Sequence, residues 1–442
     1  METRRSRAVR AKDDDLRGRD VVGRPSSPGR ARVRMGGRAQ GLKVLAALGV
    51  GLTLVGGIML AGSSIGAISP APTQWAAIGA PSSPLGLSAD APADAEEASS
   101  ASASTGMVAG PTAGSAPLQA GSAIVPGSVG RTSIDLVATY DVDLALHYGD
   151  RSLAATSTMS VTNASGGPID RLELNTIAAR LGHLALGAVT VDGRQVSPTV
   201  RDQTILVPLG GILADGATAT VRLSFRAALR RDLVGSDWLF TRTNGIIDAY
   251  RWLPWVSQRR PFTRPNYGDP FITASSPLVR VRITTDRALV IAATGQRVAA
   301  TGLSQTFEAH NVRDFTVTAS PSFTVHSARV GSTTVSVYAK VGYPVSTVLG
   351  YAKSAIAVEG AFVGAYPYPT FSVVQSAGGD GMESPELVWI PGGLSGSHLR
   401  WLIFHETAHQ WFYGIVGSDQ ANQPFADEAA ADQLARTVTG IW

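Results

Sequence analysis

Cysteine is absent from this 442-residue chain, which excludes disulfide bonds, thiolate metal sites, cysteine nucleophiles and lipid-modified cysteine anchors. Any bound metal ion must therefore be held by histidine and carboxylate side chains. Charged residues are also few, at 16%, whereas 44% of the residues are hydrophobic. That is enough apolar material for a folded core, so a wholly disordered chain is excluded. The length predicts two or three domains.

The excess of positive charge is confined to one end of the chain. Residues 1–43 hold 13 Arg and Lys against 5 Asp and Glu, and the rest of the chain holds 25 basic against 29 acidic residues. The body is therefore mildly acidic although the whole chain has a net charge of +4. A nucleic-acid partner is not expected for such a body.

Residues 44–68 carry no charged side chain and follow directly on the basic tail. As a helix this run is long enough to cross a hydrocarbon core of about 30 Å. Residues 69–130 contain no Lys or Arg, so the positive-inside rule places the N-terminus in the cytoplasm and the remainder outside. We therefore expect a single-pass membrane protein that contacts lipid through one transmembrane helix. A cleaved signal peptide is the alternative.

Residues 69–130 consist mainly of Ala, Ser, Gly and Pro, with acidic residues at 90, 94, 96 and 97. Such a composition cannot bury enough apolar surface to offset its ordering entropy, so the segment is predicted to be a flexible linker.

Residues 131–340 repeatedly show short alternating apolar and polar runs broken by turn residues, as at 157–161, 189–191, 279–283 and 333–338. Alternation with this spacing predicts an antiparallel, β-rich domain. The domain also contains a group of large aromatic residues, which favours a core or an interdomain seam over a peptide-binding surface. They are Trp238, Phe240, Tyr250, Trp252 and Trp255.

Residues 341–442 have a different pattern. Apolar residues at helical spacing predict a helix over 345–363, and a strand is predicted at 371–374 after a Tyr-Pro-Tyr-Pro segment. The mixture predicts a second, α+β domain.

This second domain contains the sequence His405-Glu406-Thr407-Ala408-His409 within an apolar-periodic stretch. Residues i and i+4 share a helix face, so both imidazoles can bind one metal ion. Zinc suits a cysteine-free site of nitrogen and oxygen ligands, and one Zn²⁺ is expected. Glu406 is then placed to accept a proton from the attacking water and to pass it to the leaving amine.

A third ligand is predicted at Glu428, which opens an Ala-rich helical run 18 residues after His409. This interval leaves room for a turn and a returning helix. On its own, an acidic residue at a helix start would simply complement the helix dipole. Asp432 follows one turn later and could orient a metal-binding histidine, although a surface acid explains it equally well.

The pattern of His405, His409 and Glu428, followed by Gln410-Trp411-Phe412-Tyr413-Gly414 after the second histidine, resembles the zinc signature of the aminopeptidase N (membrane alanyl aminopeptidase) family of gluzincins. Upstream, Gly381-Met382-Glu383 resembles the end of that family's Gly-x-Met-Glu-Asn exopeptidase motif. The resemblance implies a β-rich saddle domain followed by a thermolysin-like zinc domain. It makes His405, His409 and Glu428 the zinc ligands and Glu406 the general base, and it gives Gly381, Met382 and Glu383 to substrate binding.

Under this resemblance Glu383 binds the free α-amine of a peptide substrate. Asp380 and Ser384 depart from the motif, where Gly and Asn are expected, so an exported endopeptidase stays an alternative. Family members continue beyond the glutamate helix and supply an oxyanion-stabilising Tyr, so the sequence ending at Trp442 is expected to be a truncated member with an incomplete zinc domain. A non-catalytic module that binds extracellular peptides or partners is the third alternative.

Overall fold

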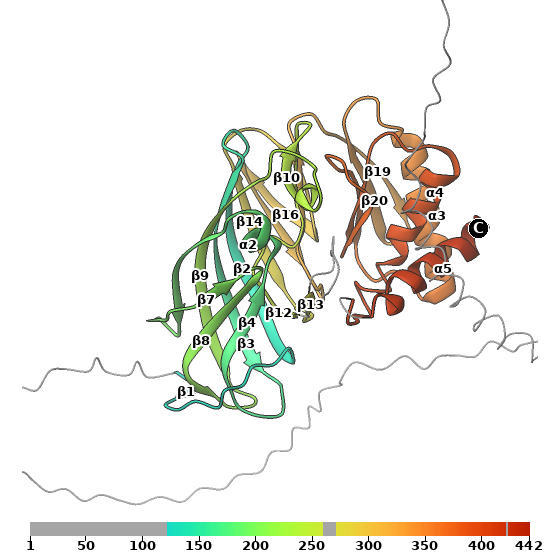
Figure 1. The fold of residues 1–442 in the computed structure, drawn as a ribbon. Coiled ribbons are helices and arrows are strands. Elements are labelled where there is room, and N and C mark those ends of the chain that lie inside the picture. Colours follow the sequence, from blue (N-terminus) through green and yellow to red (C-terminus); the bar gives the residue numbers. More distant parts are fainter. Residues whose placement is uncertain (1–121, 260–270, 421–422) are drawn as a thin grey trace, which may run out of the picture. The chain divides into compact units, whose positions relative to one another are not determined.

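The computed structural model describes residues 122–259, 271–420 and 423–442 (Figure 1). All of them lie within one compact unit, Gly110–Trp442. The predicted basic tail (1–43), the predicted membrane helix (44–68) and most of the predicted linker lie outside the described residues and stay predictions. Among the helices of the described part, none is both long and apolar enough to cross a bilayer.

The largest sheet of the β-rich domain has eight strands in the order β16-β17-β14-β2-β3-β9-β5-β6. Along β2, β3 and β9 the side chains alternate between buried and more accessible, as the period-two pattern predicts. The long strands pair antiparallel, except that β14 runs parallel to β2. The strands are β2 (Leu136–His147), β3 (Ser152–Asn163), β5 (Ala185–Val191), β6 (Arg194–Gln195), β9 (Thr218–Ala228), β14 (Val279–Thr285), β16 (Gln296–Thr301) and β17 (Ser304–Ala309).

Two smaller sheets complete this domain. A six-stranded sheet contains β1 (Ile124–Val125), β4 (Ile169–Asn175), β7 (Thr199–Arg201), β8 (Thr204–Leu213), β12 (Trp255–Arg259) and β13 (Phe271–Thr273). A four-stranded sheet has the order β10 (Phe240–Thr243), β11 (Ile246–Ala249), β18 (Val317–Ser320) and β15 (Val290–Ala293). Short helical segments, α2 (Ile177–Leu181) and η2 (Asp237–Leu239), connect strands. The predicted antiparallel, β-rich character is therefore confirmed.

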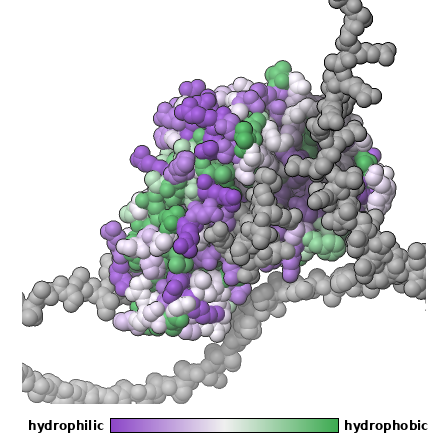
Figure 2. Space-filling model, viewed as in Figure 1, coloured by the Kyte–Doolittle hydropathy of each residue, from purple (hydrophilic) through white to green (hydrophobic). Residues whose placement is uncertain are grey.

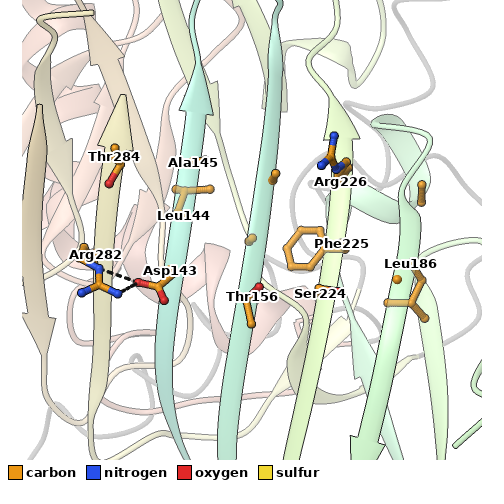
Figure 3. A pocket seen from close by; sticks show the side chains of 14 residues that line it. Asp143, Leu144, Ala145, Thr156, Leu186, Ser224, Phe225, Arg226, Arg282 and Thr284 are labelled. Atoms are coloured by element: carbon orange, nitrogen blue, oxygen red, sulfur yellow. Dashed lines mark hydrogen bonds and ion pairs between the residues drawn. The ribbon is translucent and has the colours of Figure 1, made fainter. Parts of the chain in front are cut away.

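The accessible face of the eight-stranded sheet forms an open depression floored by small side chains such as Ala145 and Thr156 (Figure 3). Arg282 donates to Asp143 across neighbouring strands at 2.6 Å between Nε and Oδ1. The residues that line this depression include no histidine or glutamate. The viewed surface mixes hydrophilic and hydrophobic side chains (Figure 2), as is usual for folded proteins. Asp143 is the one carboxylate among these lining residues, and it is paired with Arg282.

The second domain is built on a five-stranded sheet in the order β19 (Thr324–Val330), β20 (Thr333–Ala339), β21 (Thr370–Gln375), β23 (Leu387–Ile390) and β22 (Met382–Ser384). Helices α3 (Val345–Val363), α4 (Gly396–Ala408) and α5 (Glu428–Thr439) lie on the side of this sheet that faces away from the β-rich domain (Figure 1), and the one-turn η3 (Pro424–Ala426) precedes α5. The predicted helix over 345–363 is confirmed, and the predicted strand at 371–374 lies within β21.

The structure moves both boundaries that were predicted for the β-rich domain. The hairpin β19–β20 belongs to the second sheet, because β20 pairs parallel with β21, so the second domain begins near Thr324 and not at 341.

Residues 122–130, predicted as linker, are ordered against the first domain. Strand β1 pairs with β8, and the Asp170 carboxylate accepts hydrogen bonds from Ser128 and from the next three backbone N–H groups. This segment has no alternating apolar pattern, so the sequence analysis could not distinguish it from the linker.

The aromatic group is buried, as predicted: Trp238 and Tyr250 lie at the seam between the two domains, whereas Trp252 and Trp255 pack within the β-rich domain on Phe225 and Tyr140. Trp389 of β23 is fully buried and packs edge-on against Trp238, with ring centroids 6.1 Å apart, and against Tyr250 at 5.9 Å. Its indole Nε1 donates to Thr318 at 2.7 Å. The seam is therefore a shared core, and it places loops of the β-rich domain against strand β22.

Candidate metal centre

Helix α4 presents both predicted histidines from one face. Its apolar residues Leu399, Leu402 and Ile403 are buried against the domain core, and the helix begins after Ser395. His405 lies in the last turn and His409 is the residue that ends the helix, still in right-handed helical geometry. The two imidazoles are therefore one turn apart, and both are buried.

Helix α5 returns antiparallel to α4 and brings Glu428 to the histidines. The direction follows from the packing, because Ala408 lies with Ala431 while Phe404, one turn earlier, lies with Ala435, one turn later. Glu428 is the first residue of α5, and its Oε2 lies 3.3 Å from His405 Nε2 and 3.7 Å from His409 Nε2. The two Nε2 atoms are 3.3 Å apart. The sequence prediction that these three side chains converge agrees with the structure.

These three atoms fit a tetrahedral metal site. Zn–N and Zn–O bonds of about 2.0–2.1 Å at tetrahedral angles place neighbouring ligand atoms about 3.3–3.4 Å apart. The three measured separations, 3.3, 3.3 and 3.7 Å, lie at or just above that value. Two imidazoles and one carboxylate without thiolate are also the ligand chemistry that zinc accepts in catalytic sites. The residues therefore fit a single Zn²⁺.

Glu406 and Glu383 lie beside His409. Ligand atoms of Glu383, Glu406 and His409 all lie within 4.8 Å of one another, and all three residues are buried. Glu383 lies on β22, the edge strand of the sheet. Gly381, just before that strand, lies so close to Glu406 that a Cβ atom would overlap the Glu406 carboxylate. Met382 is buried on the same strand. The Gly381-Met382-Glu383 segment therefore packs against helix α4 so closely that residue 381 has no room for a side chain.

The charges of the site act on each other. Burial raises the pKa of Glu406 well above its ordinary value, His409 opposes this rise, and the carboxylates of Glu428 and Asp380 add to it. Burial on its own lowers the pKa of His409, but the carboxylate of Asp427 outweighs this and the pKa lies well above the usual range. Hydrogen bonds with His405 and His409 overcome burial and hold the pKa of Glu428 well below its ordinary value. Glu428 is thus an anion facing imidazoles, and Glu406 is a carboxyl that holds a proton readily.

Asp427 takes the role that the sequence analysis considered for Asp432. His409 Nδ1 lies 2.7 Å from Asp427 Oδ1, and both groups are buried. Asp432 instead accepts from Trp401 Nε1 at 3.0 Å and pairs with Arg436 at 2.7 Å. Because α4 and α5 are antiparallel, a residue one turn after Glu428 faces one turn before His405, which is Trp401. Asp432 therefore acts only indirectly, through the Trp401 ring that stacks on His405 at 5.1 Å.

Gln410, next to the second histidine, ties the metal helix to strand β22. Its Nε2 donates to the Ser384 carbonyl at 2.8 Å, and its Oε1 accepts from the Glu386 N–H at 2.8 Å. Both ends of a fully buried amide are thus used on the turn that follows Glu383. This residue fixes the register of Glu383 against His409, and sequence reasoning had given it no individual role.

The loop before Gly381 is held by the β-rich domain. Asn244 Nδ2 donates to the Ala377 carbonyl at 2.8 Å, and the Ala377 N–H donates to Asp248 Oδ2 at 2.7 Å. Gly379, with φ of +88°, lies directly on the Trp238 ring, where a Cβ atom would overlap it. The first domain therefore shapes the wall of the site in which Glu383 lies.

Asp248 predicts a pH-dependent stability. Burial raises its pKa to about 7, and the hydrogen bonds from Ala377 and Thr318 oppose this. Between about pH 5 and 7 the folded protein keeps this proton while the unfolded chain releases it, so the free energy of unfolding falls as pH rises, by up to about 1.4 kcal/mol per pH unit. We expect Asp248→Asn to flatten this slope in denaturant titrations. Asp143→Asn, at an exposed position, serves as the control, and equal slopes in both variants would contradict the assignment.

Comparison with solved structures finds the same fold in M1 zinc metallopeptidases. The enzyme from Deinococcus radiodurans aligns with a TM-score of 0.54 and 19% identity over 72% of this chain and 74% of its own. A variant of it described as bound to a Tyr-Ser-Ala substrate aligns with a TM-score of 0.53 and 20% identity over 73% and 75%. A two-domain M1 zinc metallopeptidase variant bound to L-arginine gives 0.54 and 20% over the same shares.

At this level of identity the likeness establishes the fold. It agrees with the β-rich and α+β parts described above and carries no statement about activity. A scan against protein-family models found no match, and neither did a search of curated proteins.

Proposed function

We propose that this protein is a zinc-dependent aminopeptidase that removes N-terminal residues from peptides. The observation that carries the proposal is the convergence of His405 Nε2, His409 Nε2 and Glu428 Oε2 at separations that suit one tetrahedral Zn²⁺. The shared fold with M1 zinc metallopeptidases supports it. His405, His409 and Glu428 would hold the ion, and when bound it supplies Lewis-acid polarisation of the scissile carbonyl and a lowered pKa for water.

Glu406 is the general base of the proposed reaction. Its carboxylate lies within 4.8 Å of the ligand atom of His409, in a site where burial raises its pKa. A carboxylate with a raised pKa accepts a proton from water readily, and the resulting carboxylic acid can then donate it to the leaving amine. The absence of a side chain on Gly381 leaves room for this carboxylate.

Glu383 selects the substrate. Its carboxylate is buried on an edge strand beside the metal ligands, and a fixed negative charge there attracts the protonated N-terminus of a peptide. The peptide bond that reaches the metal is then the first one. Ser384, which replaces the expected Asn of the motif, turns its hydroxyl away to Asp314 at 2.5 Å. The amine is therefore bound through Glu383 itself, and exopeptidase action is favoured over cleavage within a chain.

The site is proposed to work outside the cytoplasm, on a membrane-anchored protein. This part of the proposal is supported by the uncharged run 44–68, the basic residues before it and the absence of Lys and Arg from 69–130. A protease-protection experiment on intact cells or spheroplasts tests it. We expect the body to be digested from outside while an N-terminal tag is protected.

Zinc analysis and paired substrates test the enzymatic proposal. We expect the purified full-length chain to hold one zinc ion and to hydrolyse amino-acid anilides with a free amine, but not their N-acetylated forms. In Glu383→Gln, KM for the free-amine substrate should rise about 10–100-fold, since charge-assisted hydrogen bonds contribute about 1.5–3 kcal/mol. Glu308→Gln, on the outer face of the large sheet, is the control.

Each outcome separates the proposal from an alternative. Equal rates on blocked and free substrates would support an endopeptidase and remove the role of Glu383. One bound zinc ion without hydrolysis of either substrate would favour the non-catalytic module that binds extracellular peptides or partners. No zinc in the wild-type protein would end the metallopeptidase assignment.

A further inference from the structure

A buried arginine of the β-rich domain is connected to the metal centre by a chain of hydrogen bonds. Arg251 follows β11 and is 2% exposed. Its Nη2 donates to Gln420 Oε1 at 3.1 Å, Gln420 Nε2 donates to Asp427 Oδ2, and Asp427 Oδ1 contacts His409 Nδ1. Gln420 and Asp427 are buried as well. The chain thus runs from one domain to a metal ligand of the other through three polar contacts.

The chemistry of the groups fixes the direction of this chain. A guanidinium can only donate hydrogen bonds, so the Gln420 amide must present its oxygen to Arg251 and its NH₂ group to Asp427. Asp427, an acceptor, is then held against the N–H of His409 Nδ1, which leaves Nε2 for the metal. An arginine in the first domain therefore sets the orientation of a side chain in the second.

The same arginine also reaches the strand that carries Glu383. Arg251 Nε lies 3.5 Å from Asp314 Oδ2, and Asp314 accepts hydrogen bonds from the hydroxyls of Ser384 and Tyr413. Ser384 is the neighbour of Glu383 on β22. The Arg251 guanidinium also lies over the rings of Tyr250 and Tyr413, 5.0 Å from each centroid.

The backbone at this position is held in an unusual conformation. Arg251 has φ of +39° and Tyr413 has φ of +127°, a region that favours glycine. The Arg251 carbonyl accepts from Thr176 Oγ1 and from the Ile177 N–H, each at 3.1 Å. Strain of this kind persists only where surrounding contacts outweigh it, and here the guanidinium of the same residue contacts Gln420 and Asp314.

We propose that Arg251 is a positioning residue that orients the metal ligand His409 through Gln420 and Asp427, and the strand of Glu383 through Asp314 and Ser384. The inference rests on the proposed zinc peptidase function. It makes the β-rich domain part of the metal site. The spacing between the metal and the Glu383 carboxylate then depends on Arg251, which is neither a metal ligand nor the amine-binding residue.

Gln420→Met is the sharpest test of the first arm, because it removes both amide hydrogen bonds at similar side-chain volume. We expect its zinc Kd, measured by competition with a chromophoric chelator on the full-length chain, to rise about 10–100-fold. We also expect the visible absorption of the fully Co²⁺-loaded protein to change. Gln433→Met, exposed on α5, is the matched control and should behave as wild type.

Arg251→Lys and Ser384→Ala test the two ends of the proposal. Lysine keeps the charge but lacks the planar fork, so zinc affinity should again fall about tenfold or more. Ser384→Ala should raise KM for the free-amine substrate severalfold and leave the zinc Kd unchanged. Wild-type zinc Kd and cobalt spectra in both Gln420→Met and Arg251→Lys would overturn the inference while leaving the zinc peptidase intact. Absence of zinc from the wild type would instead remove the proposed function itself.

Discussion

Glu406→Gln is expected to lower kcat by about 10²–10⁴-fold while the protein keeps its zinc. The amide is nearly isosteric with the carboxyl, so it fits beside Gly381, where space is too small for any Cβ atom on that residue. It cannot take a proton from water, which is the role proposed for Glu406. None of the three predicted metal ligands changes, so the metal content should stay at one ion. Steady-state hydrolysis of a free-amine anilide, with zinc measured on the same preparation, checks both halves.

A second variant, Glu406→Asp, tests the same residue. Glu406→Asp keeps an ionisable group one methylene further from the reaction, so it should recover part of the rate lost in Glu406→Gln. A rate in Glu406→Gln within tenfold of wild type would assign proton transfer to another group. Equal loss of zinc and activity would show instead that residue 406 supports metal binding.

The sequence could identify the metal ligands because they depend on local geometry. Two histidines four residues apart share a helix face wherever the helix lies, and an interval of 18 residues allows one return helix. The helix over 345–363 could be predicted for a similar reason, since apolar spacing is a property of a short segment.

The partner of His409 could not be identified in the same way. Whether residue 427 or residue 432 reaches the histidine depends on the relative direction of α4 and α5, which only the packing of Ala408 on Ala431 and of Phe404 on Ala435 reveals. The antiparallel arrangement places Asp427 beside His409 and Asp432 beside Trp401. The Asp427-Glu428 pair at the start of α5 was the available signal, but only Glu428 was assigned to the metal and Asp427 was given no role of its own.

Contacts between the two domains could not be predicted from the sequence. Arg251 and Gln420 are 169 positions apart in the sequence and meet beside the seam where Trp389 of β23 packs on Tyr250, the residue before Arg251. The domain boundary was displaced for a related reason. Strand β20 alternates as any half-buried strand does, and the sheet to which β19 and β20 belong is decided by the parallel pairing of β20 with β21.

Glu428→Ala is expected to abolish activity and to weaken zinc binding by more than the about 10–100-fold typical of losing an outer hydrogen-bond partner. It removes the only carboxylate in contact with both imidazoles among the described residues, and with it the negative charge that faces them. His405 and His409 would remain, but two imidazoles leave half of a tetrahedral site to water. Zinc Kd from chelator competition and hydrolysis at saturating zinc measure the two effects separately.

Asp432→Ala is the matched control, because this acid lies one turn further along the same helix and contacts Trp401 and Arg436. We expect its zinc Kd to change much less than that of Glu428→Ala, since its connection to His405 runs through the stacked Trp401 ring. If the two variants bound zinc equally, residue 428 would not be a ligand, and the three-atom convergence would have to be explained by hydrogen bonding alone. If Glu428→Ala alone lost zinc, the antiparallel return of α5 would be the feature of the fold that completes the metal centre.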